Sequence, residues 1–142
     1  MSELIGANEM SKLLRDLPER VQGAALQKSA YAGANVLRNE VRRGAPSSKA
    51  GERSPSSKEF GRIKSNVRVS RGRNEGSPAR RFAFVRIKRS FWAAFYEFGT
   101  AHQPARPFFR PAIDGKSSAA LSAMQAGLAA ALDAALTKLG RK

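Results

Sequence analysis

Side chains able to do acid–base or metal chemistry are scarce in this chain. His102 is the only histidine among 142 residues, and there is no cysteine. A histidine beside a carboxylate can act as a general base held by its partner, so Glu97 and His102 form one conceivable pair. A loop histidine more often makes only a structural hydrogen bond, and zinc needs several histidine or cysteine ligands. We therefore expect no catalytic residue, no bound metal and no cofactor.

A nucleotide-binding loop is also missing from the sequence. The glycines of segment 71–76 lack the spacing and the Lys-Ser/Thr ending of a phosphate-binding loop. Glu97 is better explained as a half-buried acid that pairs with Arg106 or Arg110 and holds a turn closed. The sequence predicts a protein that is not an enzyme.

Positive charge is the strongest chemical feature of the chain. It has 26 Lys and Arg against 11 Asp and Glu, a net charge of +15, and residues 42–110 hold 17 of the basic and 4 of the acidic residues, so +13 lies there. Such a segment attracts polyanions or acidic protein surfaces, although a solvated face that aids solubility has the same composition. The candidate contacts to DNA or an acidic partner are Arg62, Lys64, Arg68, Arg71, Arg73, Arg80, Arg81, Arg86, Lys88 and Arg89.

Helical patterns precede this basic region. Residues 8–17 have helical spacing with Asn8 as a candidate N-cap. From Pro18 to about Arg43 apolar residues recur every three or four positions, and Gly44-Ala45-Pro46 should end that helix. Many of these residues are small, which permits close approach of another backbone. The stripe consists of Leu26, Ala30, Gly33, Leu37 and Val41.

The basic region itself divides into an arm and a hairpin. Residues 46–61 are rich in Ser, Gly, Pro and charge, which predicts an arm that is flexible in the free protein. Residues 62–89 predict a basic antiparallel hairpin. Its first strand has Ile63, Val67 and Val69 alternating with polar residues, and its second spans 81–88.

The last third of the chain should supply an aromatic segment and a helix. Residues 91–98 carry five aromatics, and periodicity does not decide between a strand and a short helix. Residues 111–140 predict a C-terminal helix whose stripe is Leu121, Met124, Leu128, Leu132, Ala135 and Leu139. The expected class is α+β, one domain over residues 1–142, with the two long helices packed on a small antiparallel sheet.

No segment is expected to enter a membrane. No uninterrupted run approaches the roughly 18 apolar residues of a spanning helix. The first residues also lack the basic-then-apolar order of a secretory signal. We expect a soluble protein without a membrane partner.

A stiff connector over residues 95–112 joins the aromatic segment to the last helix. Gly99 offers a positive φ for a sharp reversal, and the prolines fix φ and extend the residues before them. One ring of the Phe108–Phe109 pair should fill the core between the long helices and the sheet, and the other could cover a patch on an adjoining subunit. Asp114 should favour the positive end of the last helix. The prolines are Pro104, Pro107 and Pro111.

Two motifs in and before this connector resemble a known family. Residues 95–100, FYEFGT, and 103–112, QPARPFFRPA, look like the tail-completion or neck family of long-tailed bacteriophages, the small head–tail joining morphogenesis proteins. Residues 61–66, GRIKSN, resemble that family's Gly-x-Leu-x-x-Ser step, with Ile63 for Leu and Asn66 for Ser. The long 46–61 arm and Gly115, which interrupts the helix, depart from the family pattern. The residues matching the sharper motif are Glu97, Phe98, Gly99, Thr100, Pro104, Pro107, Phe108, Phe109, Arg110 and Pro111.

The resemblance implies a structural protein of the virion. It would be made in the host cytoplasm and added at the top of the tail as a homo-oligomeric ring, expected to have six members. Its partners would be the tail-terminator ring and the head-closure or connector proteins, with genomic DNA in the channel close by.

The rival interpretation is a basic module that binds the DNA backbone without sequence specificity. A basic two-stranded ribbon can enter a major groove. However, the sequence has no zinc spacing, RNA-recognition signature or evident helix-turn-helix. Its aromatics lie in apolar runs that predict core packing rather than base stacking. The sequence does not choose between a basic surface that faces DNA and one that faces acidic proteins.

Overall fold

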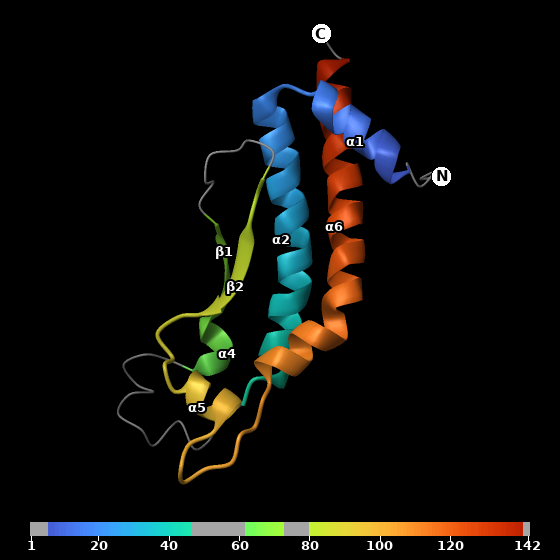
Figure 1. Ribbon diagram of the computed structural model, residues 1–142. Coiled ribbons are helices and arrows are strands. Elements are labelled where there is room, and N and C mark those ends of the chain that lie inside the picture. Colours follow the sequence, from blue (N-terminus) through green and yellow to red (C-terminus); the bar gives the residue numbers. More distant parts are fainter. Residues whose placement is uncertain (1–5, 47–61, 73–79, 141–142) are drawn as a thin grey trace.

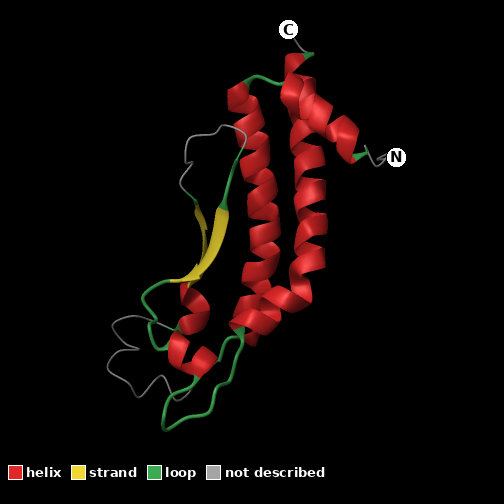
Figure 2. Ribbon diagram, viewed as in Figure 1, coloured by secondary structure: helices red, strands yellow, loops and turns green. Residues whose placement is uncertain are grey.

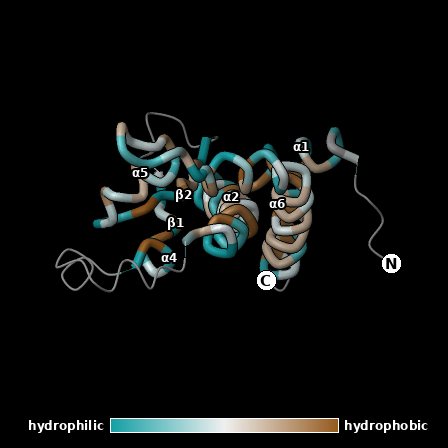
Figure 3. Tube along the Cα trace, turned by 90° about the horizontal axis from the view of Figure 1, so that it is seen from below, coloured by the Kyte–Doolittle hydropathy of each residue, from teal (hydrophilic) through white to brown (hydrophobic). Residues whose placement is uncertain are grey.

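The computed structural model describes residues 6–46, 62–72 and 80–140, and it has the predicted α+β architecture (Figure 1). Two long helices lie side by side, and a two-stranded antiparallel sheet lies along the other side of the first of them (Figures 1 and 3). The first long helix is therefore the middle layer. In chain order the elements are α1 (Ala7–Asp16), α2 (Glu19–Gly44), α4 (Ile63–Asn66), β1 (Val67–Arg71), β2 (Ala83–Ile87), α5 (Ala93–Phe98) and α6 (Phe109–Leu139).

Small residues let α2 and α6 approach each other closely, as their composition predicts. Gly33 of α2 is buried beneath the Met124 side chain, and a Cβ built on it would lie 3.0 Å from the Ala120 carbonyl oxygen. The Ser29 hydroxyl donates a hydrogen bond to the Met124 carbonyl oxygen at 2.7 Å. The absent side chain of Gly33 thus leaves the space that Met124 occupies between the two helices.

The predicted leucine stripe of α6 meets α2 in part, because Met124 lies on Gly33 and Val21 packs against the Leu132 cluster. Leu132 is only 1% exposed because Leu17, at the end of α1, packs on it together with Leu14. Leu121 and Leu139, on either side of this contact, remain 56% and 48% exposed. Helix α1 therefore covers only the middle of the stripe.

Helix α6 is long and apolar enough, by length and composition, to cross a membrane, and only 17% of its most apolar stretch is buried. The expectation that no segment meets that measure is wrong. An uninterrupted run was the wrong criterion, because Ser122 and Gln125 interrupt the run without making the average polar. One such helix is weak evidence for insertion, since helices of soluble proteins have the same property. Two leucines of α6, Leu121 and Leu139, stay uncovered by the described chain, one on each side of the contact with α1.

The two strands form the predicted hairpin with a shorter first strand. Figure 2 shows the two strands side by side. Val67 pairs with Ile87 and Val69 with Val85, and Val67, Val85 and Ile87 pack in or against the core. Residues 63–66 were expected to extend this strand but form the helical turn α4 instead. Its closing hydrogen bonds run from the Ser65 and Asn66 N–H groups to the Arg62 carbonyl oxygen. In this helical turn the side chains of Ile63 and Asn66 are both buried. In a strand, residues three positions apart would point to opposite faces.

Helix boundaries differ from the predicted ones by one or two residues. Helix α1 begins after Gly6, whose carbonyl accepts the Met10 N–H at 3.0 Å, so Asn8 lies inside the helix and does not cap it. Helix α6 begins at Phe109 rather than at residue 111 and continues through Gly115. The predicted 46–61 arm lies outside the described residues except for its first.

Candidate functional site

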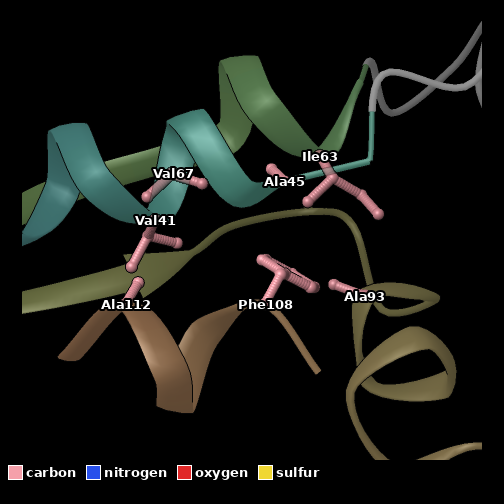
Figure 4. Packing of buried hydrophobic residues seen from close by; sticks show 7 residues of the cluster. All are labelled: Val41, Ala45, Ile63, Val67, Ala93, Phe108 and Ala112. Carbon is pink, nitrogen blue, oxygen red and sulfur yellow. The ribbon is translucent and has the colours of Figure 1, made fainter. Parts of the chain in front are cut away.

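The first half of the site is a core that the 95–112 connector completes. Phe108 is 6% exposed and belongs to a cluster built from α2, α4, β1, α5 and α6 (Figure 4). Phe109 is partly buried and packs against this cluster. The prediction that one of the two rings fills the core between helices and sheet is confirmed. The cluster comprises Val41, Ala45, Ile63, Val67, Ala93, Phe108 and Ala112.

Glu97 joins α5 to the start of α6. Its carboxylate accepts hydrogen bonds from the N–H groups of Phe108, Phe109 and Arg110 at 2.8, 2.9 and 3.0 Å. These N–H groups lie at the helix N-terminus, where the backbone offers no intrahelical acceptor. A carboxylate there also interacts favourably with the helix dipole. Glu97 therefore caps α6 from a distance of eleven residues along the chain.

The environment of Glu97 favours its ionised form. Burial alone would raise the pKa of the carboxyl group, but the three backbone hydrogen bonds and the nearby Arg110 charge lower it. Together they leave the pKa of Glu97 below its ordinary value of 4.5. The cap is consequently charged at neutral pH, where a charged acceptor makes the stronger hydrogen bonds.

The predicted partners of Glu97 need correction. Arg106 contributes its backbone instead, donating a hydrogen bond to the Tyr96 carbonyl oxygen at 2.7 Å. The Arg110 guanidinium lies 4.8 Å from the centre of the Phe98 ring, and this arginine reaches Glu97 through its N–H. Asp114 lies beyond the first turn of α6, so the acid at the positive end of that helix is Glu97. The turn is held closed by a backbone cap rather than by an ion pair.

Between Glu97 and Phe108 the chain makes a tight reversal. Gly99 has φ +75°, as predicted, and a Cβ on it would lie 2.8 Å from the Ala105 nitrogen. Thr100 and Gln103 exchange two backbone hydrogen bonds of 2.8 and 3.3 Å across the turn. Pro104 and Pro107, both exposed, follow that turn. The motif residues are therefore brought together by backbone geometry.

His102 belongs to this turn and is exposed. Its backbone N–H donates to the Thr100 hydroxyl at 3.3 Å. Within the described residues no hydrogen bond joins His102 to Glu97, and no group of three or more His, Cys, Asp or Glu could hold a metal ion. The arrangement supports a turn, not a base and its orienting partner.

Aromatic side chains cover the outside of the same region. Phe91 and Phe98 are 63% and 64% exposed, and Phe95 is exposed between them with its ring edge-on to Phe91 at 6.1 Å. A groove of about 360 Å³ lies beside them, and the guanidinium-bearing Arg86 and Arg110 line it. The expectation that the aromatics of residues 91–98 belong to the core holds for Trp92 and Tyr96, which pack against the cluster, and is wrong for the three phenylalanines, which are exposed.

Two polar contacts that hold the hairpin were not singled out as interactions in the sequence. The Arg42 guanidinium donates two hydrogen bonds, of 3.1 and 2.9 Å, to the Val67 carbonyl oxygen and so ties α2 to β1. The buried Asn66 amide donates to the Ser90 hydroxyl at 2.7 Å. Asn66 was visible through the resemblance of residues 61–66. Nothing distinguished Arg42 from the other basic residues at a helix end.

The predicted basic contacts do form one exposed region. Arg68 and Arg86 are paired across the strands, and the other described members are exposed except Arg81, which is half-buried beside Gly23 of α2. Arg73 lies outside the described residues. Arg68 and Arg86 lie on the outer face of the hairpin, whereas Arg71 and Arg81 lie beside residues of α2.

Comparisons with known proteins do not place the chain in a family. No protein-family model matches it, and no curated protein or solved structure matches it either.

Proposed function

We propose that this chain is a structural protein of a bacteriophage neck, which completes the tail and joins it to the head connector through ring-to-ring protein contacts. It would work as a homo-oligomeric ring, expected to have six members, between the tail-terminator ring and the head-closure proteins. The kind of assembly comes from the resemblance of residues 95–112. The physical support comes from the surfaces that the fold leaves apolar.

The observation that carries the proposal is the uncovered apolar surface of α5 and α6. Soluble monomers rarely expose large contiguous apolar patches, and larger ones mark interaction sites. Here Phe91, Phe95 and Phe98 are exposed at one end, and Leu121 and Leu139 are exposed along α6. Burying such side chains against a partner contributes roughly 1.5–3 kcal/mol each. These exposed side chains therefore favour a protein that assembles with partners.

The Glu97 cap supports the same proposal. It fixes the start of α6 relative to α5, so the exposed phenylalanines and the long helix form one rigid unit. Rigid surfaces lose less conformational entropy when they bind. A ring component must meet several neighbours at once, and a preset angle between its contact elements serves that purpose.

Electron microscopy of infected-cell lysates tests the proposal. A phage with this gene removed should accumulate separate heads and tails, and a plasmid copy of the gene should restore joined particles. Normal, infectious particles in the absence of the gene would rule out a neck role.

A membrane is the other environment that could cover α6, and vesicle flotation separates the two. Vesicles of uncharged phosphatidylcholine avoid attraction by the basic hairpin. The purified protein should stay at the bottom of the gradient if α6 is covered by protein partners. Flotation with the vesicles would favour a membrane and contradict the proposal.

A further inference from the structure

The outer face of the β1–β2 hairpin combines exposed aromatic rings with positive charge. Along β2 exposure alternates, so that Phe84 and Arg86 point away from the core while Val85 and Ile87 pack toward it. Phe82, just before β2, lies on the same side and is 45% exposed, and Phe84 is 48% exposed. A strand that needed only solubility would place polar residues at these positions.

The two rings are held in a defined arrangement. Their centroids are 6.4 Å apart and their planes differ by only 9°, so both rings face the same way. They lie over Gly72, where an added Cβ would be 2.8 Å from the edge of the Phe84 ring. The absent side chain of Gly72 therefore provides the space in which the rings lie parallel.

Two arginines lie on the same face of the hairpin as the rings. The Arg86 guanidinium carbon is 5.7 Å from the centre of the Phe84 ring, and Arg68 is directly opposite Arg86 in the register. Side chains directly opposite in an antiparallel pair share a face of the sheet. The described parts of the hairpin, residues 62–72 and 80–90, contain no acidic residue. Their basic residues are Arg62, Lys64, Arg68, Arg71, Arg80, Arg81, Arg86, Lys88 and Arg89.

This charge pattern selects the class of partner. The outer face carries Arg68 and Arg86 in a hairpin whose described parts have no acid, and this complements a polyanion, whereas an apolar protein interface normally has few charges at its centre. Parallel aromatic faces add a second requirement, because flat unpaired bases stack on them, and bases inside a duplex are already stacked. The face matches the two parts of a single-stranded nucleic acid, phosphates and free bases.

We infer that the outer face of the hairpin binds single-stranded nucleic acid, with bases stacked on Phe82 and Phe84 and phosphates contacted by Arg68 and Arg86. Binding is indifferent to sequence, because every base has a face that can stack. This activity goes beyond the neck role and does not depend on it. It also differs from contact with the backbone of duplex DNA, in which the arginines would bind phosphates and no base would stack on the rings.

Fluorescence anisotropy with labelled oligo-dT, and with a duplex of the same length, tests the inference. Replacing one ring, as in Phe84→Leu, should weaken oligo-dT binding at least about fivefold and leave duplex binding unchanged. Phe84→Tyr keeps the ring and should bind like the parent. Arg68→Gln should weaken binding to both probes and reduce the salt dependence by about one phosphate contact.

A matched control comes from the other aromatic surface. Phe98→Leu removes a ring outside the hairpin that is even more exposed than Phe84, and it should leave oligo-dT binding unchanged. Equal losses on oligo-dT and duplex, or the same loss in the tyrosine variant, would overturn the inference. It would also fall if Phe84→Leu bound oligo-dT normally but no longer entered particles, because the face would then contact protein.

Discussion

The connector over residues 95–112 buries its main apolar side chain within the chain, whereas the outer side of α6 leaves apolar side chains exposed. In the connector, Phe108 is buried, and the N–H groups at the start of α6 have an acceptor in Glu97. Along α6, Leu121 and Leu139 stay exposed, and the only leucine fully covered is the one that α1 reaches. The first region is complete within one chain, and the second stays exposed in the part of the chain that the structure describes.

This difference separates stability from assembly. Changes in the connector should lower the free energy of unfolding, because its contacts are already made in the isolated protein. Changes on the outer side of α6 should leave folding intact and affect only what the protein binds. The predictions below test that separation, beginning with the largest effect.

The largest loss is expected for Phe108→Ala. Truncating a buried phenylalanine typically costs about 3–5 kcal/mol, a large share of the roughly 5–15 kcal/mol of a small domain. Urea denaturation of the purified proteins measures the change. Phe98→Ala is the matched control, since its ring is 64% exposed and should alter the free energy of unfolding by no more than about 0.5 kcal/mol. Similar losses in both variants would end the distinction between the two regions.

Gly99→Val should be the next most severe change. The positive φ disfavours a β-branched residue, and its Cβ would meet the Ala105 nitrogen at 2.8 Å. We expect a destabilisation of about 1–3 kcal/mol, measured by the shift of the thermal midpoint. Gly115→Val is the control for valine itself, because a Cβ at Gly115 meets nothing within 4 Å. If the two variants unfold alike, the reversal at residue 99 is not a constraint.

A smaller and pH-dependent effect is expected for Glu97→Gln. The pKa of Glu97 is lowered in the folded protein, so its contribution is complete above the ordinary value of 4.5 and is lost as the pH falls through the folded pKa. Loss of the charged cap should cost about 1–2 kcal/mol at neutral pH. In denaturation experiments the parent should be more stable than the variant at neutral pH, and the difference should vanish once the pH has fallen through the folded pKa, which lies below 4.5.

Glu40→Gln provides the comparison for this carboxylate. Glu40 forms an ion pair with Arg43 on the surface of α2, where a single pair contributes about 0–1 kcal/mol. A Glu97→Gln variant no less stable than Glu40→Gln at neutral pH would show that the cap contributes little.

Local chemistry made the connector predictable. Proline and glycine restrict φ wherever they occur, so the reversal at Gly99 and the burial of one of two adjacent phenylalanines followed from residue type. The partner of Glu97 did not follow, because a carboxylate eleven residues before a helix N-terminus gives no pattern within the helix. The role of Glu97 in closing the turn was predicted correctly, and its hydrogen-bond partners were not.

Long-range packing explains the other errors. The leucine spacing of α6 marks one side of the helix but does not say which neighbour that side meets. The small residues of α2 draw the alanines of α6 inward and leave leucines outside. Likewise Phe82 and Phe84 read as core residues in sequence, yet the alternation of β2 turns them outward. In each case the sequence identified the apolar residues, but it did not give the direction in which their side chains point.

The most direct test of the assembly surface is in vitro complementation with Leu121→Glu. Leu121 is exposed, so a charge there should not disturb the fold, and Ser122→Glu places the same charge about 100° around the helix. Purified protein is added to a lysate of a phage that lacks the gene, and joined particles are counted by electron microscopy. The parent and Ser122→Glu should restore joining, and Leu121→Glu should not. Equal restoration by both variants would contradict an assembly role for the uncovered side of α6.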